Sequence, residues 1–212
     1  MKITHFGHAC VLFEAPGARL LFDPGAYASG FEELRDLDAI LFTHEHPDHL
    51  DTERLPALLN ANPDVQVITN PGGGERLREA GVNHHTVNPG DTVEAGESTV
   101  KVLGGDHAVI HRDLPCLGNN GYLVTDLLLH PGDAFVVPDD AVRVLLLPAG
   151  GPWMKVSESI DYLRSVAPQA AVPIHQAGLA DVHQQLHYQL FRGLAPSGTE
   201  IHVLDHGVTT DF

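Results

Sequence analysis

The chain has 212 residues, of which 28 are acidic and 12 basic, for a formal charge of −16 with neutral histidines. This excess disfavours a protein that grips nucleic acid, because binding to phosphate backbones needs a basic face. Hydrophobic residues make up 43% and charged residues 19%, as in globular proteins, and no apolar run approaches the roughly 18 residues needed to cross a bilayer. The composition therefore excludes a membrane-spanning chain.

No shift in composition marks a boundary, so we expect a single domain over residues 1–212. The first residues enter an alternating pattern directly, with no charged region followed by an apolar one, which predicts a cytoplasmic protein without a signal peptide. The two cysteines, Cys10 and Cys116, lack a partner at metal spacing, and we expect both to be buried free thiols. The sequence leaves the oligomeric state open.

The first part of the chain reads as an antiparallel meander. Its β-rich runs are joined by turn signals such as Pro16-Gly17, and they are Lys2–Phe6, Cys10–Glu14 and Arg19–Asp23. A short helix is expected over Phe31–Leu37. The apolar run Ala39–Phe42 then predicts a buried strand that leads out into a polar loop.

The rest of the chain alternates helices and strands. We expect helices at Thr52–Asn60, starting or kinked at Pro56, and at Gly73–Ala80, Val156–Val166 with Ser157 as cap, and Leu179–Leu194. Strands are expected at Val65–Thr69, Thr92–Ala95, Thr99–Gly104, Tyr122–Thr125, Leu127–His130, Val142–Leu147 and Ala170–Ile174, with Ile201–Leu204 and Gly207–Thr210 as a closing pair. Two packed sheets with helices outside fit this order best. A doubly wound parallel sheet fits worse, because several connections are too short for a parallel crossover.

A cluster of histidines and carboxylates follows the strand at Ala39–Phe42, in the order His44-Glu45-His46-Pro47-Asp48-His49. Neutral imidazole nitrogens and carboxylate oxygens are the ligands of Zn²⁺ and similar ions. His44 and His46 can point the same way from an extended loop, while Asp48 and His49 lie far enough along it to face a second position. Two pairs of ligands suggest two metal ions.

Three further residues could complete such a centre, since each closes a predicted strand where the chain exits abruptly. They are His107, Asp133 and His175. Loops at strand ends are held by a rigid scaffold and still face a crevice.

The pattern His-x-His-x-Asp-His, followed in order by His107, Asp133 and His175, resembles the metallo-β-lactamase superfamily. Further motifs are similar to the metal-dependent hydrolases grouped with L-ascorbate-6-phosphate lactonase. These motifs are Gly7-His8-Ala9, Phe22-Asp23-Pro24, His107–His111, Gly118–Tyr122, His130-Pro131-Gly132-Asp133 and Val172–His175. The similarity spans nearly the whole chain.

The resemblance implies an α+β fold, an αββα sandwich of two packed mixed β-sheets with helices on the outer faces. It implies two divalent metal ions, zinc or alternatively manganese or iron, and a bridging hydroxide as nucleophile. The first ion would be held by His44, His46 and His107, and the second by Asp48, His49 and His175. Asp133 would bridge the two ions.

Other residues receive roles from their place in these motifs. Asp23 is expected to fix the tautomer of a ligand histidine, its alternative being a simple turn residue. His8 would contact the substrate or donate a proton to the leaving group, unless it is an exposed turn residue, and the same applies to His111. The superfamily resemblance implies that Asp48 accepts a proton during turnover. Trp153 could wall the pocket or pack as a surface aromatic.

The function expected is that of a metal-dependent hydrolase acting on a small ester-like substrate, a lactone or a phosphoester. A redox member of the fold is an alternative, but the related diiron flavoproteins carry Glu in place of His46 and need a flavin domain. A nucleic-acid-processing member is opposed by the charge of −16. A metal-binding module without catalysis would require the open metal positions to be blocked.

Overall fold

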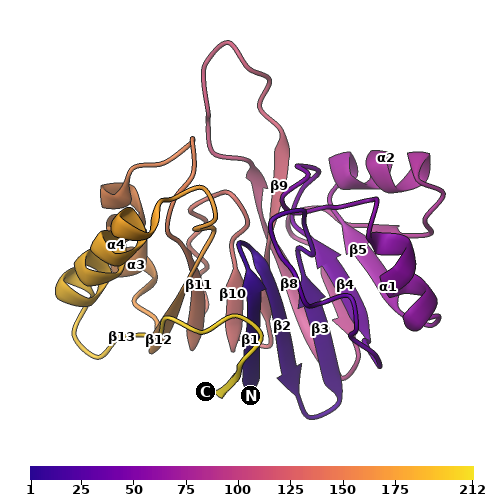
Figure 1. Cartoon of the computed structure of the whole chain (residues 1–212), viewed down its shortest axis with the longest axis horizontal. Coiled ribbons are helices and arrows are strands. Elements are labelled where there is room, and N and C mark those ends of the chain that lie inside the picture. The colour runs from indigo at the N-terminus through magenta and orange to yellow at the C-terminus, as the bar shows by residue number, and fades with distance from the viewer.

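Two seven-stranded sheets pack face to face in the computed structural model, which describes all residues from 1 to 212, and helices cover both outer faces (Figure 1). The predicted αββα sandwich is confirmed. None of the helices combines the length and the hydropathy that a membrane span requires.

The first sheet has the strand order β14-β1-β2-β3-β4-β5-β6. Its strands are β1 (Lys2–Gly7), β2 (Cys10–Ala15), β3 (Ala18–Phe22), β4 (Ala39–Phe42), β5 (Gln66–Thr69), β6 (His85–Thr86) and β14 (Thr209–Asp211). Pairing is antiparallel from β14 to β3 and parallel from β3 to β6. The helices α1 (Leu55–Ala61) and α2 (Pro71–Glu79) lie on its outer side (Figure 1).

The second sheet has the order β13-β12-β11-β10-β9-β8-β7. Its strands are β7 (Thr92–Ala95), β8 (Ser98–Asp106), β9 (Gly118–Val124), β10 (Leu128–His130), β11 (Val144–Pro148), β12 (Ala170–Ile174) and β13 (Glu200–Ile201). It is antiparallel from β7 to β10 and parallel from β10 to β13. The helices α3 (Val156–Val166) and α4 (Asp181–Leu194) cover its outer face.

Strands buried on both faces explain the near-continuous apolar runs in the sequence. In β2, Val11 and Phe13 face the core between the sheets, whereas Cys10 and Leu12 face the layer that includes α1 and α2. Successive side chains of a strand point to opposite faces, so each apolar run contributes side chains to two cores. The sheets are thereby fixed between two apolar layers, which gives the loops at their ends a rigid base.

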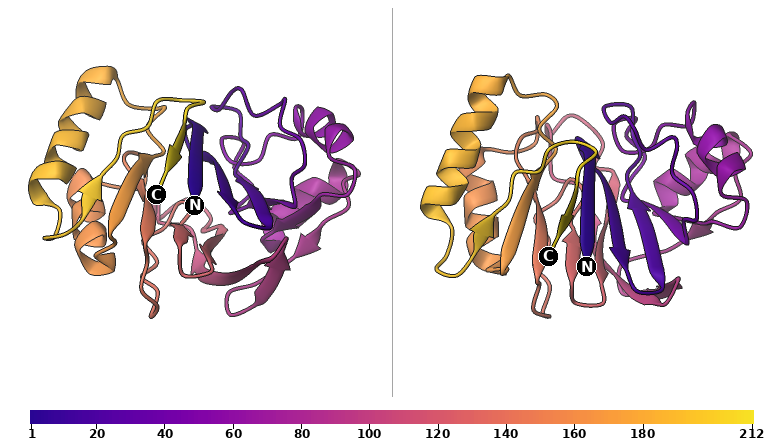
Figure 2. Two further views of the ribbon diagram at one scale, coloured as in Figure 1. Left: turned by 90° about the horizontal axis from the view of Figure 1, so that it is seen from below. Right: turned by 60° about the horizontal axis from the view of Figure 1, so that its bottom comes forward.

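Two predicted elements are wrong. Phe31–Leu37 forms turns rather than a helix, because its backbone groups are taken by a side chain from elsewhere: the Asn62 amide donates to the Leu34 carbonyl and accepts from the Leu37 N–H. The two segments of the predicted closing pair lie in different sheets, since β13 pairs with β12 and β14 with β1. Figure 2 shows the two chain ends side by side as a result of the β1–β14 pairing.

Helix starts differ in detail from those expected. The chain enters α1 at Leu55 with Pro56 in the first turn, where a missing N–H costs nothing, so the alternative of a start near Pro56 holds. In α3 the N-cap is Lys155 rather than Ser157, and the Glu158 carboxylate accepts a hydrogen bond from the Lys155 N–H at 2.6 Å.

Candidate metal centre

Histidines and carboxylates from several strand ends meet in two groups, in each of which the possible ligand atoms lie within 4.8 Å of one another. The first group is His44, His46, His107 and Asp133, and the second is His8, Asp48, His49 and His175. Two of these histidines follow strands directly, His107 after β8 and His175 after β12, and Thr43 alone separates His44 from β4. All seven residues predicted to bind metal are brought together, and His8 joins them.

Asp133 lies between the two groups and faces both. Its Oδ1 is 3.1 Å from His49 Nε2 and 3.0 Å from His175 Nε2, on the side of the second group. Its Oδ2 is 3.3 Å from His107 Nε2, on the side of the first. One carboxylate is thus directed at two separate positions.

Four buried atoms at this centre have no hydrogen-bond partner: Nε2 of His49, His107 and His175, and Oδ1 of Asp133. They approach one another closely, but their directions do not satisfy hydrogen-bond geometry. Burying polar atoms without partners is unfavourable, so such atoms call for a ligand. Imidazole nitrogens and a carboxylate form a donor set that fits divalent metal ions.

The tautomers of three histidines follow from their other ring nitrogen. His107 Nδ1 donates to the Ala108 carbonyl at 2.6 Å, and His175 Nδ1 donates to the Gly150 carbonyl. His49 Nδ1 donates to Asp23 Oδ2 at 2.7 Å. Because these acceptors place the hydrogen on Nδ1, the Nε2 of each ring has a free lone pair facing the centre when the ring is neutral.

Asp23 and Thr43 form a buried hub behind the metal-ligand candidates. Asp23 Oδ1 accepts from the Thr43 N–H at 2.8 Å, and Asp23 Oδ2 accepts from the Thr43 hydroxyl at 2.7 Å as well as from His49. Asp23 is fully buried, so these hydrogen bonds fix its carboxylate. Thr43 was not among the predicted site residues, although its place between a buried strand and the first histidine was a signal in the sequence.

His8 is buried rather than exposed in a turn. Its Nε2 lies 3.0 Å from Asp48 Oδ2, and its Nδ1 accepts from the Ala177 N–H at 3.4 Å. Nε2 therefore carries the hydrogen and donates it to Asp48. Burial is the main reason that the pKa of His8 falls to about 4, so the ring is neutral near pH 7.

Backbone strain gathers at this centre. Seven residues other than glycine have positive φ, and three of them belong to the site: His8 at 50°, Asp23 at 43° and His175 at 60°. The left-handed region is unfavourable for residues with a Cβ and persists where the surroundings impose it. The fold holds these three side chains at a conformational cost.

The pKa values of the buried histidines and of Asp133 are shifted in different directions. Burial lowers the pKa of His44 well below its ordinary value. Burial alone would raise the pKa of Asp133, but His49 and His175 outweigh it and hold that pKa well below the usual range. Burial alone would lower the pKa of His49, yet Asp133 and Asp23 outweigh it and raise that pKa. A cation that binds His49 must displace its proton.

Trp153 contacts the centre through its indole ring. Its side chain is buried, and the indole N–H donates to Asp133 Oδ2 at 2.8 Å, which excludes the surface-aromatic alternative. The main-chain N–H of Asp133 donates to Asn119 Oδ1 at 2.9 Å. These contacts hold the carboxylate between the two groups. The hydrogen bond from Trp153 to Asp133 was not predicted from the sequence.

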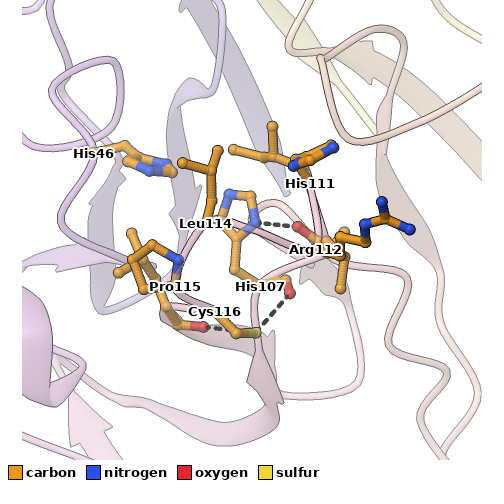
Figure 3. A pocket seen from close by; sticks show the side chains of 11 residues that line it. His46, His107, His111, Arg112, Leu114, Pro115 and Cys116 are labelled. Atoms are coloured by element: carbon orange, nitrogen blue, oxygen red, sulfur yellow. Dashed lines mark hydrogen bonds between the residues drawn. The ribbon is translucent and has the colours of Figure 1, made fainter.

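His111 does not join either group. It is exposed and lies in the loop Ala108–Leu117, which lines a pocket of about 470 Å³ together with His46 and His107 (Figure 3). Cys116 lies in the same loop and is exposed, so the expectation of a buried thiol is wrong for Cys116 and right for Cys10. The loop and two residues of the first ligand group therefore line the same pocket.

Comparisons with known proteins agree with this fold. The chain matches the family described as "Beta-lactamase superfamily domain" over residues 2–175. It is 49% identical over 193 residues to Protein Rv0786c of Mycobacterium tuberculosis, covering 89% of this chain and 90% of that protein. It is 32% identical to a UPF0173 metal-dependent hydrolase of Carboxydothermus hydrogenoformans, covering 82% and 84%.

Among solved structures, Igni18, a metallo hydrolase from Ignicoccus hospitalis, superposes with a TM-score of 0.76 at 21% identity, covering 100% of this chain and 98% of that one. Fold and sequence together define a metal-dependent hydrolase of the metallo-β-lactamase superfamily. Within that class, the chain belongs to the UPF0173 metal-dependent hydrolase family.

Proposed function

We propose that the protein hydrolyses a small ester-like molecule, a lactone or a phosphoester, at a centre that holds two divalent metal ions. The observation that carries the proposal is the set of four buried, unpartnered atoms on His49, His107, His175 and Asp133. Two of these nitrogens face Asp133 Oδ1, and the third faces Oδ2. That division supports two ions rather than one.

The two ligand groups give the assignment of residues to ions. We assign His44, His46 and His107 to the first ion, and Asp48, His49 and His175 to the second. Asp133 serves both. Asp23 holds His49 in the tautomer that leaves Nε2 free, which supports its predicted role as an orienting partner. We propose zinc as the native metal, with manganese and iron as the alternatives that such a donor set also accepts.

When bound, the ions would lower the pKa of water to about 7 and polarise the carbonyl or phosphoryl oxygen of the substrate, so that hydroxide would be the nucleophile. The residues around them position charges and protons for that chemistry. The buried side of the centre excludes water, and this exclusion strengthens the electrostatic interactions there.

Asp48 and His8 form the pair that we propose handles protons. Burial alone would raise the pKa of Asp48, but the hydrogen bond from His8 and the nearby His49 outweigh it, and the carboxylate stays ionised. An ionised Asp48 can accept a proton during turnover, while His8 fixes its orientation. The proton for the leaving group then comes from this pair. His111, at the pocket rim, remains a predicted substrate contact.

The test is turnover of a panel of lactones, phosphomonoesters, phosphodiesters and β-lactams, before and after treatment with a chelator. We expect activity on lactones or on one class of phosphoester, its loss on chelation, and its return with zinc, manganese or ferrous iron. His46→Ala should reduce the rate at least about 100-fold, because it removes a ligand of the metal. His183→Ala, an exposed histidine on α4, is the matched control and should keep the wild-type rate.

Two outcomes would contradict the proposal. One is full activity in metal-free protein, and the other is a wild-type rate for His46→Ala. Turnover of β-lactams alone would overturn the substrate class while leaving the metal centre in place.

A further inference from the structure

The loop Ala108–Leu117 joins β8 to β9 and stands above the rest of the molecule (Figure 1). Its base is fixed, because the His107 N–H donates to the Leu117 carbonyl at 2.9 Å and the Ala108 N–H donates to the Asp133 carbonyl at 2.8 Å. The second of these bonds ties the loop to the residue that faces both ligand groups. The loop is therefore placed relative to the proposed reacting atoms.

Apolar side chains are concentrated in this loop. Ten large hydrophobic residues are exposed in the whole chain, and three of them fall within six positions here: Val109 is 66% exposed, Ile110 38% and Leu114 54%. Exposed apolar residues that gather in one patch mark a binding site more often than residues scattered singly. The concentration of exposed apolar side chains in this loop therefore indicates a binding site.

The pocket that these residues line opens onto the first ligand group. Its wall consists of loop residues, and its remaining residues are His46 and His107 (Figure 3). Figure 3 shows the Leu114 side chain beside His46 and His107, with the guanidinium of Arg112 directed away from them. A volume of about 470 Å³ is in the range of sites for small molecules. An occupant of the pocket would touch the proposed metal ligands.

The pocket wall carries one fixed charge, that of Arg112, whose guanidinium is directed away from His46 and His107 (Figure 3). Arg112 is the cationic side chain of the loop, and its nearest acidic partner is Asp113 at 3.9 Å. His111 also faces Asp113, at 3.6 Å. The lining next to His46 and His107 thus offers mainly apolar contact.

We infer that the substrate carries an uncharged apolar group, an alkyl chain or a single aromatic ring, which lies in the pocket of the loop Ala108–Leu117 while its ester-like bond lies at the metal centre. This inference rests on the proposed function and adds the substrate's non-reacting part. Val109, Ile110 and Leu114 are the residues that select that part.

The test uses two homologous series, γ-lactones with alkyl side chains and alkyl phosphodiesters of increasing chain length. With the metal-loaded enzyme, kcat/KM should rise about fourfold for each added methylene until the pocket is filled, as expected for the burial of one CH₂ group. Leu114→Asn should flatten this rise, because it replaces an apolar wall of the pocket with a polar amide. Val182→Asn, which replaces a residue 72% exposed on α4, should leave the rise intact.

Turnover that does not change or falls with chain length would overturn the inference and leave the proposed function standing. So would a dimer that dissociates in Leu114→Asn during sedimentation, because the apolar loop would then be an interface between copies. Equal flattening in Val182→Asn would also overturn it.

If neither series is hydrolysed, the pocket is tested without turnover, so that the result does not depend on the proposed function. Cys116 lines the pocket and is exposed, whereas Cys10 is buried, so alkylation by iodoacetamide reports on this site. Straight-chain alcohols should slow the alkylation of Cys116 more strongly as their chains lengthen. No slowing, or slowing that does not depend on chain length, would overturn the inference.

Discussion

The orientation of the Asp133 carboxylate depends on a few neighbouring residues. Its carboxylate has to face two groups of histidines at once, and three contacts hold it there: the Trp153 indole, the Asn119 side chain and the main chain of the loop that follows His107. A hydrogen-bond donor on a shared carboxylate fixes its direction and tunes its basicity. Trp153 is therefore a positioning residue for the proposed centre.

Trp153→Phe should weaken metal binding while leaving the fold intact. The ring still packs against Phe135, but Asp133 Oδ2 loses its indole donor. We expect the affinity for zinc, measured by competition with a chromogenic chelator, to fall about 10- to 100-fold. Tyr162→Phe is the matched control, since it removes a donor to the Val136 carbonyl outside the centre. Equal affinities for wild type and Trp153→Phe would show that the indole does not position Asp133.

Part of the site could be predicted from single residues and part could not. His44, His46, Asp48 and His49 are close in sequence, so their spacing alone indicates a shared centre. The contact between Trp153 and Asp133, and the one between His8 and Asp48, depend on how distant segments pack. Sequence distance carries no signal for such pairs, and the exposure of Cys116 depends on the same packing.

At the scale of elements, buried strands were predicted well because both of their faces are apolar. β11 and β12 are buried at every position, and their runs stand out from the polar segments around them. The failures are segments with a weak pattern of their own. The conformation of Phe31–Leu37 depends on hydrogen bonds with the Asn62 side chain. The last two strands pair with the edge strands of two different sheets.

β14 closes the open edge of β1, and its removal should destabilise the protein. Ile3 pairs with Thr210, the hydroxyls of Thr4 and Thr209 lie 2.8 Å apart, and the N-terminal ammonium donates to the Phe212 carbonyl. Deleting residues 209–212 removes these contacts and exposes a strand edge. We expect a loss of about 2 kcal/mol and a fall in Tm of about 4–8 °C by circular dichroism.

Phe212→Ala separates strand pairing from side-chain packing in that experiment. Phe212 packs on the core between the sheets, so this variant removes the packing and keeps the β14 ladder. A smaller fall in Tm than in the deletion is expected. An unchanged Tm for the deletion would show that β14 does not stabilise the sheet.

For the whole molecule, we propose that residues 1–212 fold as one domain. The core between the sheets draws on both halves of the chain, from Ile3 and Phe13 to Val172 and Ile174. Metal-free protein should therefore unfold in urea in one transition, with the same midpoint by circular dichroism and by fluorescence of its one tryptophan. Separate midpoints would indicate two units that unfold independently.

The central claim is that the two ligand groups hold two metal ions around Asp133. Metal content per chain, measured by mass spectrometry of the metals after loading with zinc and removal of the excess, tests it most directly. The account predicts close to two ions in the wild type and close to one in both His46→Ala and His175→Ala, since each variant disables one group. His183→Ala should keep two. A wild-type content of one or none, or two ions in both ligand variants, would contradict the account.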